Sequence, residues 1–150
     1  MKRRDQIKLT PEEQTTFLHD ARKAALATID KEGFPHVVAM NFLARDGAIL
    51  MTSYRKAQKV LNIRRNPKVA VMVETGRKYS ELRGVMIRGE CQIIEDLPTV
   101  EATMHAIRNR DAGGTTPEQG PLTTAPKRVV LKVIAKKVAS WDHSKLGGRY

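Results

Sequence analysis

Basic and hydroxyl side chains gather in one short segment of this chain, Ser53–Pro67 (SYRKAQKVLNIRRNP), which lies between two apolar runs. We expect this segment to form a helix as far as Asn66, capped by Thr52 or Ser53. The first backbone N–H groups of such a helix have no partner within the helix, and they bind phosphate readily. The residue types therefore predict an anion-binding site at the start of this helix.

Three polar side chains of the segment repeat at helical spacing. Lys56, Lys59 and Asn62 follow one another at i, i+3 and i+6, which places them on one face of the expected helix. The other face, expected to pack, consists of Ala57, Val60, Leu61 and Arg64. A basic surface helix that only faces water is the alternative interpretation.

Few other residues have types suited to catalysis. His36 and His143 have side chains of a type suited to proton transfer, with ordinary surface histidines as the alternative. Tyr79 lies in an expected loop and is a candidate for the edge of a substrate pocket. No Ser-His-Asp order, zinc-ligand spacing or glycine-rich nucleotide loop occurs, so hydrolase and kinase classes have no support. We assign no catalytic residue and no metal site.

Composition narrows the class of protein. A chain of 150 residues with 41% hydrophobic and 29% charged residues fits one globular domain, residues 1–150. The single cysteine, Cys91, lies in an apolar run and is expected in the core, with no disulfide. A formal net charge of +11 favours an anionic ligand. Nucleic acid is disfavoured, because only 5% of residues are aromatic and no helix-turn-helix or zinc-finger pattern occurs.

The cellular location is inferred from the apolar segments of the chain. No window reaches the continuous apolar length of a membrane span. The first residues, MKRRDQIKLTPEEQ, lack the apolar segment of a signal peptide. We therefore expect a cytoplasmic protein with no membrane partner.

Hydrophobic periodicity and turn signals predict a mainly β domain with three helices. The helices are expected at residues 10–23, 53–66 and 96–110, and the first begins with Thr10, Pro11 and Glu13 in a capping box. Strands are expected at residues 24–29, 35–43, 48–52, 68–74, 83–95 and 129–141. A Gly-, Thr- and Pro-rich loop at residues 111–126 is long enough to contact a partner.

Short turns between the expected strands predict antiparallel hairpins, as at Asp30–Gly33 and Arg45–Gly47. Six strands joined in this way favour a closed or partly closed antiparallel barrel over an open sheet. The physical reason is that closure removes unpaired strand edges.

An ordered set of short motifs resembles the pyridoxamine 5′-phosphate oxidase-like split β-barrel superfamily over nearly the whole chain. These motifs are ALATI at 25–29, GFPHVV at 33–38, the run from Ser53 through NIRRNP at 62–67, RGV at 83–85 and RGE at 88–90. The ending SWDHSKLG at 140–147 is similar to the mycobacterial-type branch that binds the deazaflavin coenzyme F420.

The resemblance implies an antiparallel split β-barrel of the FMN-binding type, forming a homodimer with a flavin or deazaflavin in a groove between the subunits. In the family, the cofactor phosphate is held by residues that match Ser53, Lys59 and Asn62, and Lys56 is a further candidate. Residues that match the ring site are Val38, Ala39, Met40, Asn41, Met51 and Thr52.

The resemblance also gives the C-terminal segment an expected role. Trp141 is expected to stack on the cofactor ring from the partner subunit, with a buried tryptophan at the strand end as the alternative. Residues 141–145 are then expected to cross the dimer interface and close the partner's groove, and a frayed tail is the competing interpretation.

The function implied is that of an F420-dependent oxidoreductase, which transfers a hydride between the bound cofactor and a small organic acceptor. F420 carries a phosphodiester and an acidic oligoglutamate tail, so it would use more of the +11 charge than the single phosphate of FMN. An FMN-binding oxidoreductase of the same class and a non-catalytic flavin, F420 or haem carrier are the alternatives. Oxidation of vitamin B6 is not expected, because the Arg-rich C-terminal substrate signature of true pyridoxamine phosphate oxidases is absent.

Overall fold

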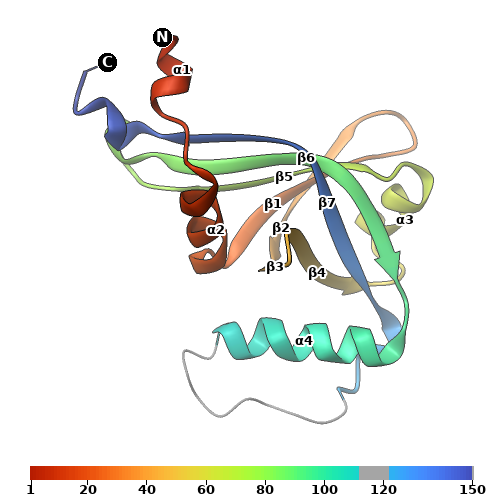
Figure 1. Ribbon diagram of the computed structural model, residues 1–150. Helices are drawn as coiled ribbons and strands as arrows, with labels where there is room; N and C mark the ends of the chain where they lie inside the picture. The colour runs from red at the N-terminus through yellow and green to blue at the C-terminus, as the bar shows by residue number, and fades with distance from the viewer. Residues whose placement is uncertain (112–121, 150) are drawn as a thin grey trace.

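The computed structural model describes residues 1–111 and 122–149, which form four α-helices and one antiparallel sheet of seven strands (Figure 1). The strands are β1 Lys23–Ile29, β2 Pro35–Asn41, β3 Leu43–Arg45, β4 Ala48–Tyr54, β5 Lys68–Thr75, β6 Arg83–Ile94 and β7 Arg128–Asp142. The helices are α1 Arg3–Gln6, α2 Pro11–Asp20, α3 Gln58–Arg65 and α4 Leu97–Asp111. Short 3-10 turns are η1 Tyr79–Glu81, η2 Ala125–Lys127 and η3 His143–Leu146.

The strand order in the sheet is β2-β1-β5-β6-β7-β4-β3, and every neighbouring pair is antiparallel. The sheet curls into a half-barrel, so that β4 faces back toward β1 and β2 (Figure 1). This architecture confirms the predicted mainly β, antiparallel split-barrel fold.

The two longest strands, β6 and β7, form the spine of the sheet (Figure 1). Their register shifts between Arg88 and Gly89, which pair with Lys137 and Ala135, so β7 carries one extra residue at this point. A Cβ atom on Gly89 would lie 2.2 Å from the backbone oxygen of Ile134. Only glycine therefore lets the two backbones approach this closely.

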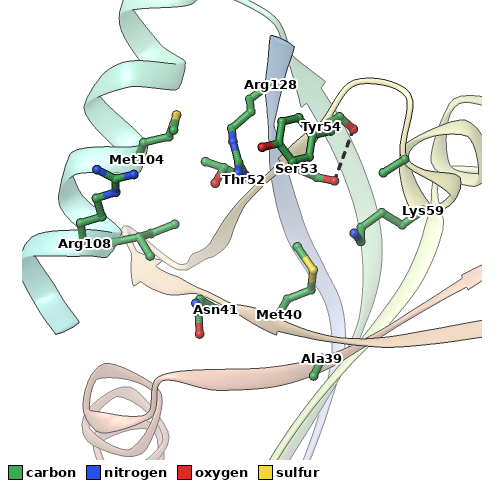
Figure 2. A pocket seen from close by; sticks show the side chains of 12 residues that line it. Ala39, Met40, Asn41, Thr52, Ser53, Tyr54, Lys59, Met104, Arg108 and Arg128 are labelled. Carbon is green, nitrogen blue, oxygen red and sulfur yellow. Dashed lines mark hydrogen bonds between the residues drawn. The ribbon is translucent and has the colours of Figure 1, made fainter. Parts of the chain in front are cut away.

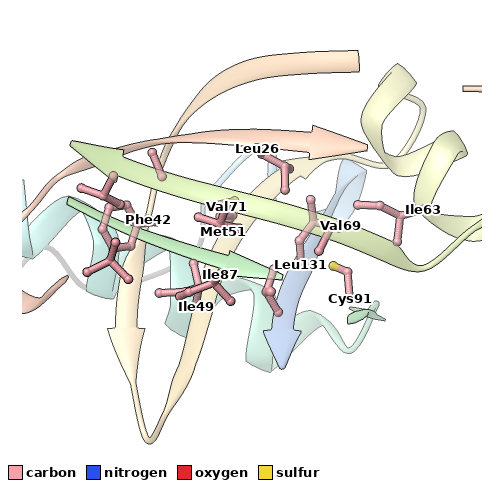
Figure 3. Packing of buried hydrophobic residues seen from close by; sticks show 14 of the residues in the cluster. Leu26, Phe42, Ile49, Met51, Ile63, Val69, Val71, Ile87, Cys91 and Leu131 are labelled. Carbon is pink, nitrogen blue, oxygen red and sulfur yellow. The ribbon is translucent and has the colours of Figure 1, made fainter. Parts of the chain in front are cut away.

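The core lies inside the curl of the sheet, where side chains from β1, β4, β5, β6 and β7 interdigitate (Figure 3). Side chains alternate between the two faces of β6, since Ile87 and Cys91 are buried while Arg88 and Glu90 face outward. Burial raises the pKa of the Cys91 thiol to about 12, so this group stays protonated and packs as a small apolar side chain.

Two of the helices cover different parts of the sheet. Thr10 and Glu13 form the predicted capping box at the start of α2, which buries Phe17 in the core. Helix α4 carries an apolar stripe at helical spacing, since Val100, Met104 and Ile107 are all buried. Contacts of Val100 and Met104 with Val130 and Leu50 place α4 against β7 and β4.

The second predicted strand, at residues 35–43, is wrong at its end, and seven strands replace the six expected. The chain leaves β2 after Asn41 because Phe42 buries its ring in the core, and its N–H donates to the Arg22 carbonyl at 3.2 Å. Pairing resumes with β4 at Leu43, which begins β3. The first helix also ends earlier than predicted, at Asp20, and α1 was not predicted.

The predicted helix at residues 53–66 is wrong at its start. Ser53 and Tyr54 continue β4, because they pair with Val129 and Arg128 of β7. Helix α3 begins at Gln58 after an Ala57 cap that makes no side-chain hydrogen bond, so neither Thr52 nor Ser53 caps it. Lys56 therefore precedes the helix and does not share a helical face with Lys59.

Among the helices of residues 1–111 and 122–149, none is long and apolar enough to cross a membrane. Most of the loop predicted at 111–126 lies outside the described residues.

Candidate functional site

A pocket of about 390 Å³ opens between β2, β4 and the helices α3 and α4, beside the first residue of β7 (Figure 2). Backbone and side chains of β2 and β4 form one side, and the C-terminal half of α4 forms the opposite side (Figure 2). The lining residues are Ala39, Met40, Asn41, Thr52, Ser53, Tyr54, Ala57, Lys59, Met104, Ile107, Arg108 and Arg128.

The pocket is electropositive. Lys59, Arg108 and Arg128 contribute cations, and none of the twelve lining residues carries a carboxylate. The pKa of Lys59 is lowered, first by partial burial and second by the positive charge of Arg128. Two cations that destabilise each other in the free protein are stabilised by an anion placed between them.

Arg128 is held in place by two contacts. Its guanidinium stacks over the Tyr54 ring at 4.2 Å, and its Nε donates to Thr124 Oγ1 at 3.3 Å. The strand register brings these residues together, because Tyr54 and Arg128 are partners across β4 and β7. Ser53, directly before Tyr54, is buried with its hydroxyl donating to the Tyr54 carbonyl at a long 3.4 Å (Figure 2).

Asn62 fixes the orientation of α3. Its side chain is fully buried and donates to Thr28 Oγ1 at 3.0 Å, while its Oδ1 accepts from Gln58 at 2.7 Å and from Arg65 at 3.2 Å. Because Lys59 lies one helical turn before Asn62, this network directs the Lys59 side chain toward the pocket.

The sequence named eleven candidate cofactor-binding residues, and the fold brings six of them together around this pocket. The six are Ala39, Met40, Asn41, Thr52, Ser53 and Lys59. Val38 packs against the core and the Met51 side chain is fully buried there, and neither residue lines the pocket. Asn62 is occupied by its own network, as described above.

Lys56 lies in a second hollow of about 410 Å³ that adjoins the pocket through Tyr54, which lines both. The remaining residues of this hollow are Arg55, Lys56 and Lys127. Arg55 is partly neutralised by Glu95 at 3.6 Å. Within the described part of the chain, no acidic side chain pairs with Lys56 or Lys127.

Trp141 lies at the opposite end of β7 from Arg128, away from the pocket of its own chain. Its indole N–H donates to the Glu74 carboxylate at 2.8 Å, and its ring covers Gly84. The following residues fold into η3, where Lys145 binds Glu13 at 2.7 Å. The C-terminal segment is thus tied to α2 of its own chain.

Other residues considered for catalysis lie outside the pocket. His143 contacts Tyr79 through its Nδ1 and the Tyr79 carbonyl at 2.9 Å, with ring centroids 4.4 Å apart. His36 lies on β2 but does not line the pocket. In the described ranges, no three His, Cys, Asp or Glu residues are placed to hold a metal ion.

The sequence did not point to the other six residues that line the pocket, which are Tyr54, Ala57, Met104, Ile107, Arg108 and Arg128. Met104, Ile107 and Arg108 lie on α4, and Arg128 is the first residue of β7. Their positions depend on the pairing of β4 with β7 and on the packing of α4, and no local pattern reports either.

Comparison with known proteins identifies the class of this fold. The sequence pattern of the family described as "Pyridoxamine 5'-phosphate oxidase" matches residues 10–142. The chain belongs to this family. Among curated proteins, none matches the chain in sequence.

Solved structures resemble the chain over most of its length. A conserved hypothetical protein of Mycobacterium tuberculosis is 32% identical with a TM-score of 0.86, over 100% of this chain and 95% of that one. An F420 reductase is 27% identical with a TM-score of 0.72, over 87% of this chain and 98% of that one. An FAD-binding protein of Mesorhizobium loti is 20% identical with a TM-score of 0.70, over 89% and 94%, and shows the fold alone.

Proposed function

We propose that this chain is an oxidoreductase that uses F420 and acts on a small organic acceptor. The observation that carries the proposal is the pocket in which Lys59 and Arg128 face one cavity beside Ser53, with no carboxylate among the lining residues. The likeness to an F420 reductase at 27% identity supports the same conclusion. When bound, F420 supplies the hydride chemistry, and the protein supplies binding and orientation.

The lining of the pocket fits a phosphorylated ring cofactor. Lys59, Arg128 and the Ser53 hydroxyl would hold a phosphate by charge-assisted hydrogen bonds. The thioethers of Met40 and Met104, one from each side of the pocket, would contact a flat aromatic ring (Figure 2). Asn41 and the polar backbone at Thr52 would orient the ring's polar edge. Asn62 supports Lys59 in this arrangement, and its predicted direct contact with the cofactor stays a prediction.

The second hollow favours F420 over FMN. FMN has one terminal phosphate, which the first pocket would satisfy, whereas F420 continues as a phosphodiester and an acidic tail. Lys56 and Lys127 line the adjoining hollow and lack acidic partners in the described residues, so they would take up this additional negative charge.

We further propose that the functional unit is a homodimer. A row of apolar side chains crosses the outer face of five strands, in the order Ala39, Ala25, Met72, Met86 and Ala139. Val37, in the neighbouring row, is 61% exposed, and Met72 is 41% exposed. Because Ala39 also lines the pocket, a second copy that covers this face would border the cofactor.

Titration of the purified protein with F420, FMN and haem, followed by absorption and fluorescence, tests the cofactor. We expect saturable F420 binding that is tighter than FMN binding. Reduction of the bound cofactor and its reoxidation on adding acceptors separates an enzyme from a carrier. Tighter binding of FMN would overturn the cofactor choice, and binding of neither would overturn the proposal.

A Met72→Asp substitution tests the dimer. Placing a charge at the centre of the apolar row should give a monomer by light scattering and weaken cofactor binding at the shared site. Leu97→Asp is the matched control, because Leu97 is 42% exposed but lies on α4, away from this face. A wild-type protein that is monomeric at micromolar concentration would contradict the homodimer.

A further inference from the structure

Arg110, near the C-terminal end of α4, makes an unusual number of backbone contacts for one side chain. Its guanidinium donates to the carbonyl oxygens of Leu18, His19 and Ala21, around the end of α2, and to that of Phe42. It also lies over the Phe42 ring, 5.2 Å from the ring centroid. One planar group therefore connects three segments that are far apart in sequence.

The contacts with α2 have a clear local reason. The last carbonyls of a helix have no partner within it and carry the negative end of the helix dipole. Ala21 N–H satisfies the Phe17 carbonyl and Arg22 satisfies that of Asp20, which leaves Leu18 and His19 for Arg110. The planar fork of arginine donates to several acceptors at once, which a lysine ammonium does not match in geometry.

The contact with Phe42 reaches the opposite side of the pocket. Phe42 directly follows Asn41, and residues 39–41 form the β2 side of the pocket. Ile107 and Arg108 line the α4 side of the pocket, and Arg110 lies only two residues after Arg108 on the same helix. Arg110 therefore links the two sides of the pocket, although its own side chain does not line the pocket.

We infer that Arg110 is a positioning residue that sets the width of the cofactor pocket by linking α4 to the end of β2. The inference rests on the proposed function in so far as the pocket holds a cofactor. A pocket of fixed width keeps Met40 and Met104 at a constant separation, which orients a flat ring between them (Figure 2).

The test compares Arg110→Lys, which keeps the charge but loses the planar fork, with Arg110→Met, which keeps only the chain length. Ser140→Ala is the control, because it removes the buried hydroxyl that accepts from Leu9 N–H at 3.0 Å, far from the pocket. The first readout is amide hydrogen exchange of the free protein. The second is the affinity for F420 and FMN, measured well below the melting temperature of each variant.

We expect both Arg110 variants to exchange faster at residues 39–42 and at 104–110 together. Their affinity for the cofactor that the wild type binds should fall on the order of tenfold. Ser140→Ala should change neither the exchange at these residues nor the cofactor affinity, even if it lowers the melting temperature as much as the Arg110 substitutions do. If Arg110→Met does not fold, Arg110→Lys decides the matter.

Faster exchange confined to residues 17–21, with unchanged cofactor affinity, would overturn the inference and leave Arg110 as a cap of α2. If the wild type binds neither F420 nor FMN, the proposed function fails. The exchange measurement then still decides whether Arg110 links the two sides of the pocket.

Discussion

The two ends of β7 differ in whether the positively charged side chains near them are paired with carboxylates. At the end near Trp141, cations are paired with carboxylates, as in Arg83 with Asp142 at 3.3 Å and Lys145 with Glu13 at 2.7 Å. At the end near Arg128, Lys59 and Arg128 face one pocket with no carboxylate among its lining residues. The paired charges hold η3 against α2 and β7 against β6, whereas the two pocket cations repel each other and are the proposed ligands of an anion.

The largest effect is expected from removing a cation of the pocket. Lys59→Met should weaken cofactor binding by about 1.5–3 kcal/mol, because it deletes a charge-assisted contact with the phosphate. Calorimetric titration measures this loss. Lys8→Met is the matched control and should leave the affinity unchanged, because Lys8 pairs with Asp5 at 2.7 Å and does not line the pocket. Equal affinities for the wild type and Lys59→Met would show that Lys59 does not bind the phosphate.

A smaller effect is expected from a larger side chain beside Trp141, at the other end of β7. A Cβ atom at Gly84 would lie 2.4 Å from the Trp141 ring, so Gly84→Ala must displace the indole, at a cost of about 1–3 kcal/mol in the free energy of unfolding. Chemical denaturation measures this cost. We also expect weaker cofactor retention, since Trp141 is predicted to border the groove of the partner subunit. Reduced stability with unchanged retention would limit this end to a structural role.

The pH dependence of anion binding tests whether Lys59 supplies positive charge to the pocket. Because the pKa of Lys59 is lowered, this side chain loses its charge at a lower pH than an ordinary lysine in the free protein. Anion affinity should therefore decline as the pH rises through that range. In Lys59→Arg the decline should shift to higher pH, since arginine stays protonated. Identical pH profiles for the two proteins would assign the decline to another group.

The smallest effect is expected on stability at low pH, and it concerns Glu13, which pairs with Lys145 near the Trp141 end of β7. The hydrogen bond from Lys145, together with that from the Thr10 N–H, lowers the pKa of Glu13. A lowered folded-state pKa means that the contribution of Glu13 to stability is present above its ordinary pKa and is lost as the pH falls through the lowered value. The wild type should therefore lose slightly more stability in acid than Glu13→Gln does. Parallel acid denaturation curves would contradict this contribution.

Local patterns in the sequence predicted much of the fold. The capping box at Thr10 and Glu13, the alternation along β6 and the apolar stripe of α4 each depend on neighbours a few residues away. Each was therefore readable from one sequence. The family resemblance then placed these elements in a split barrel, and the matching family pattern supports that placement.

The start of α3 shows where a prediction from local residue types is wrong. Thr52 and Ser53 have the residue types of helix caps, but the backbone of Ser53 and Tyr54 pairs with Val129 and Arg128, and Arg55 N–H continues this pairing to the Lys127 carbonyl at 2.9 Å. Strand pairing over this distance in sequence outweighs the local capping preference. It also moves Lys56 out of the helix and into the neighbouring hollow.

The sequence by itself determined where most of the strands lie, and it identified Lys59 among the residues whose types could bind an anion. Only the tertiary structure decided that Arg128 lies beside Lys59, that Asn62 is buried in a supporting role and that Arg110 joins α4 to α2 and Phe42. The physical reason is that these contacts join residues through strand register and helix packing. Both are properties of the whole chain, and a local spacing of residues does not encode them.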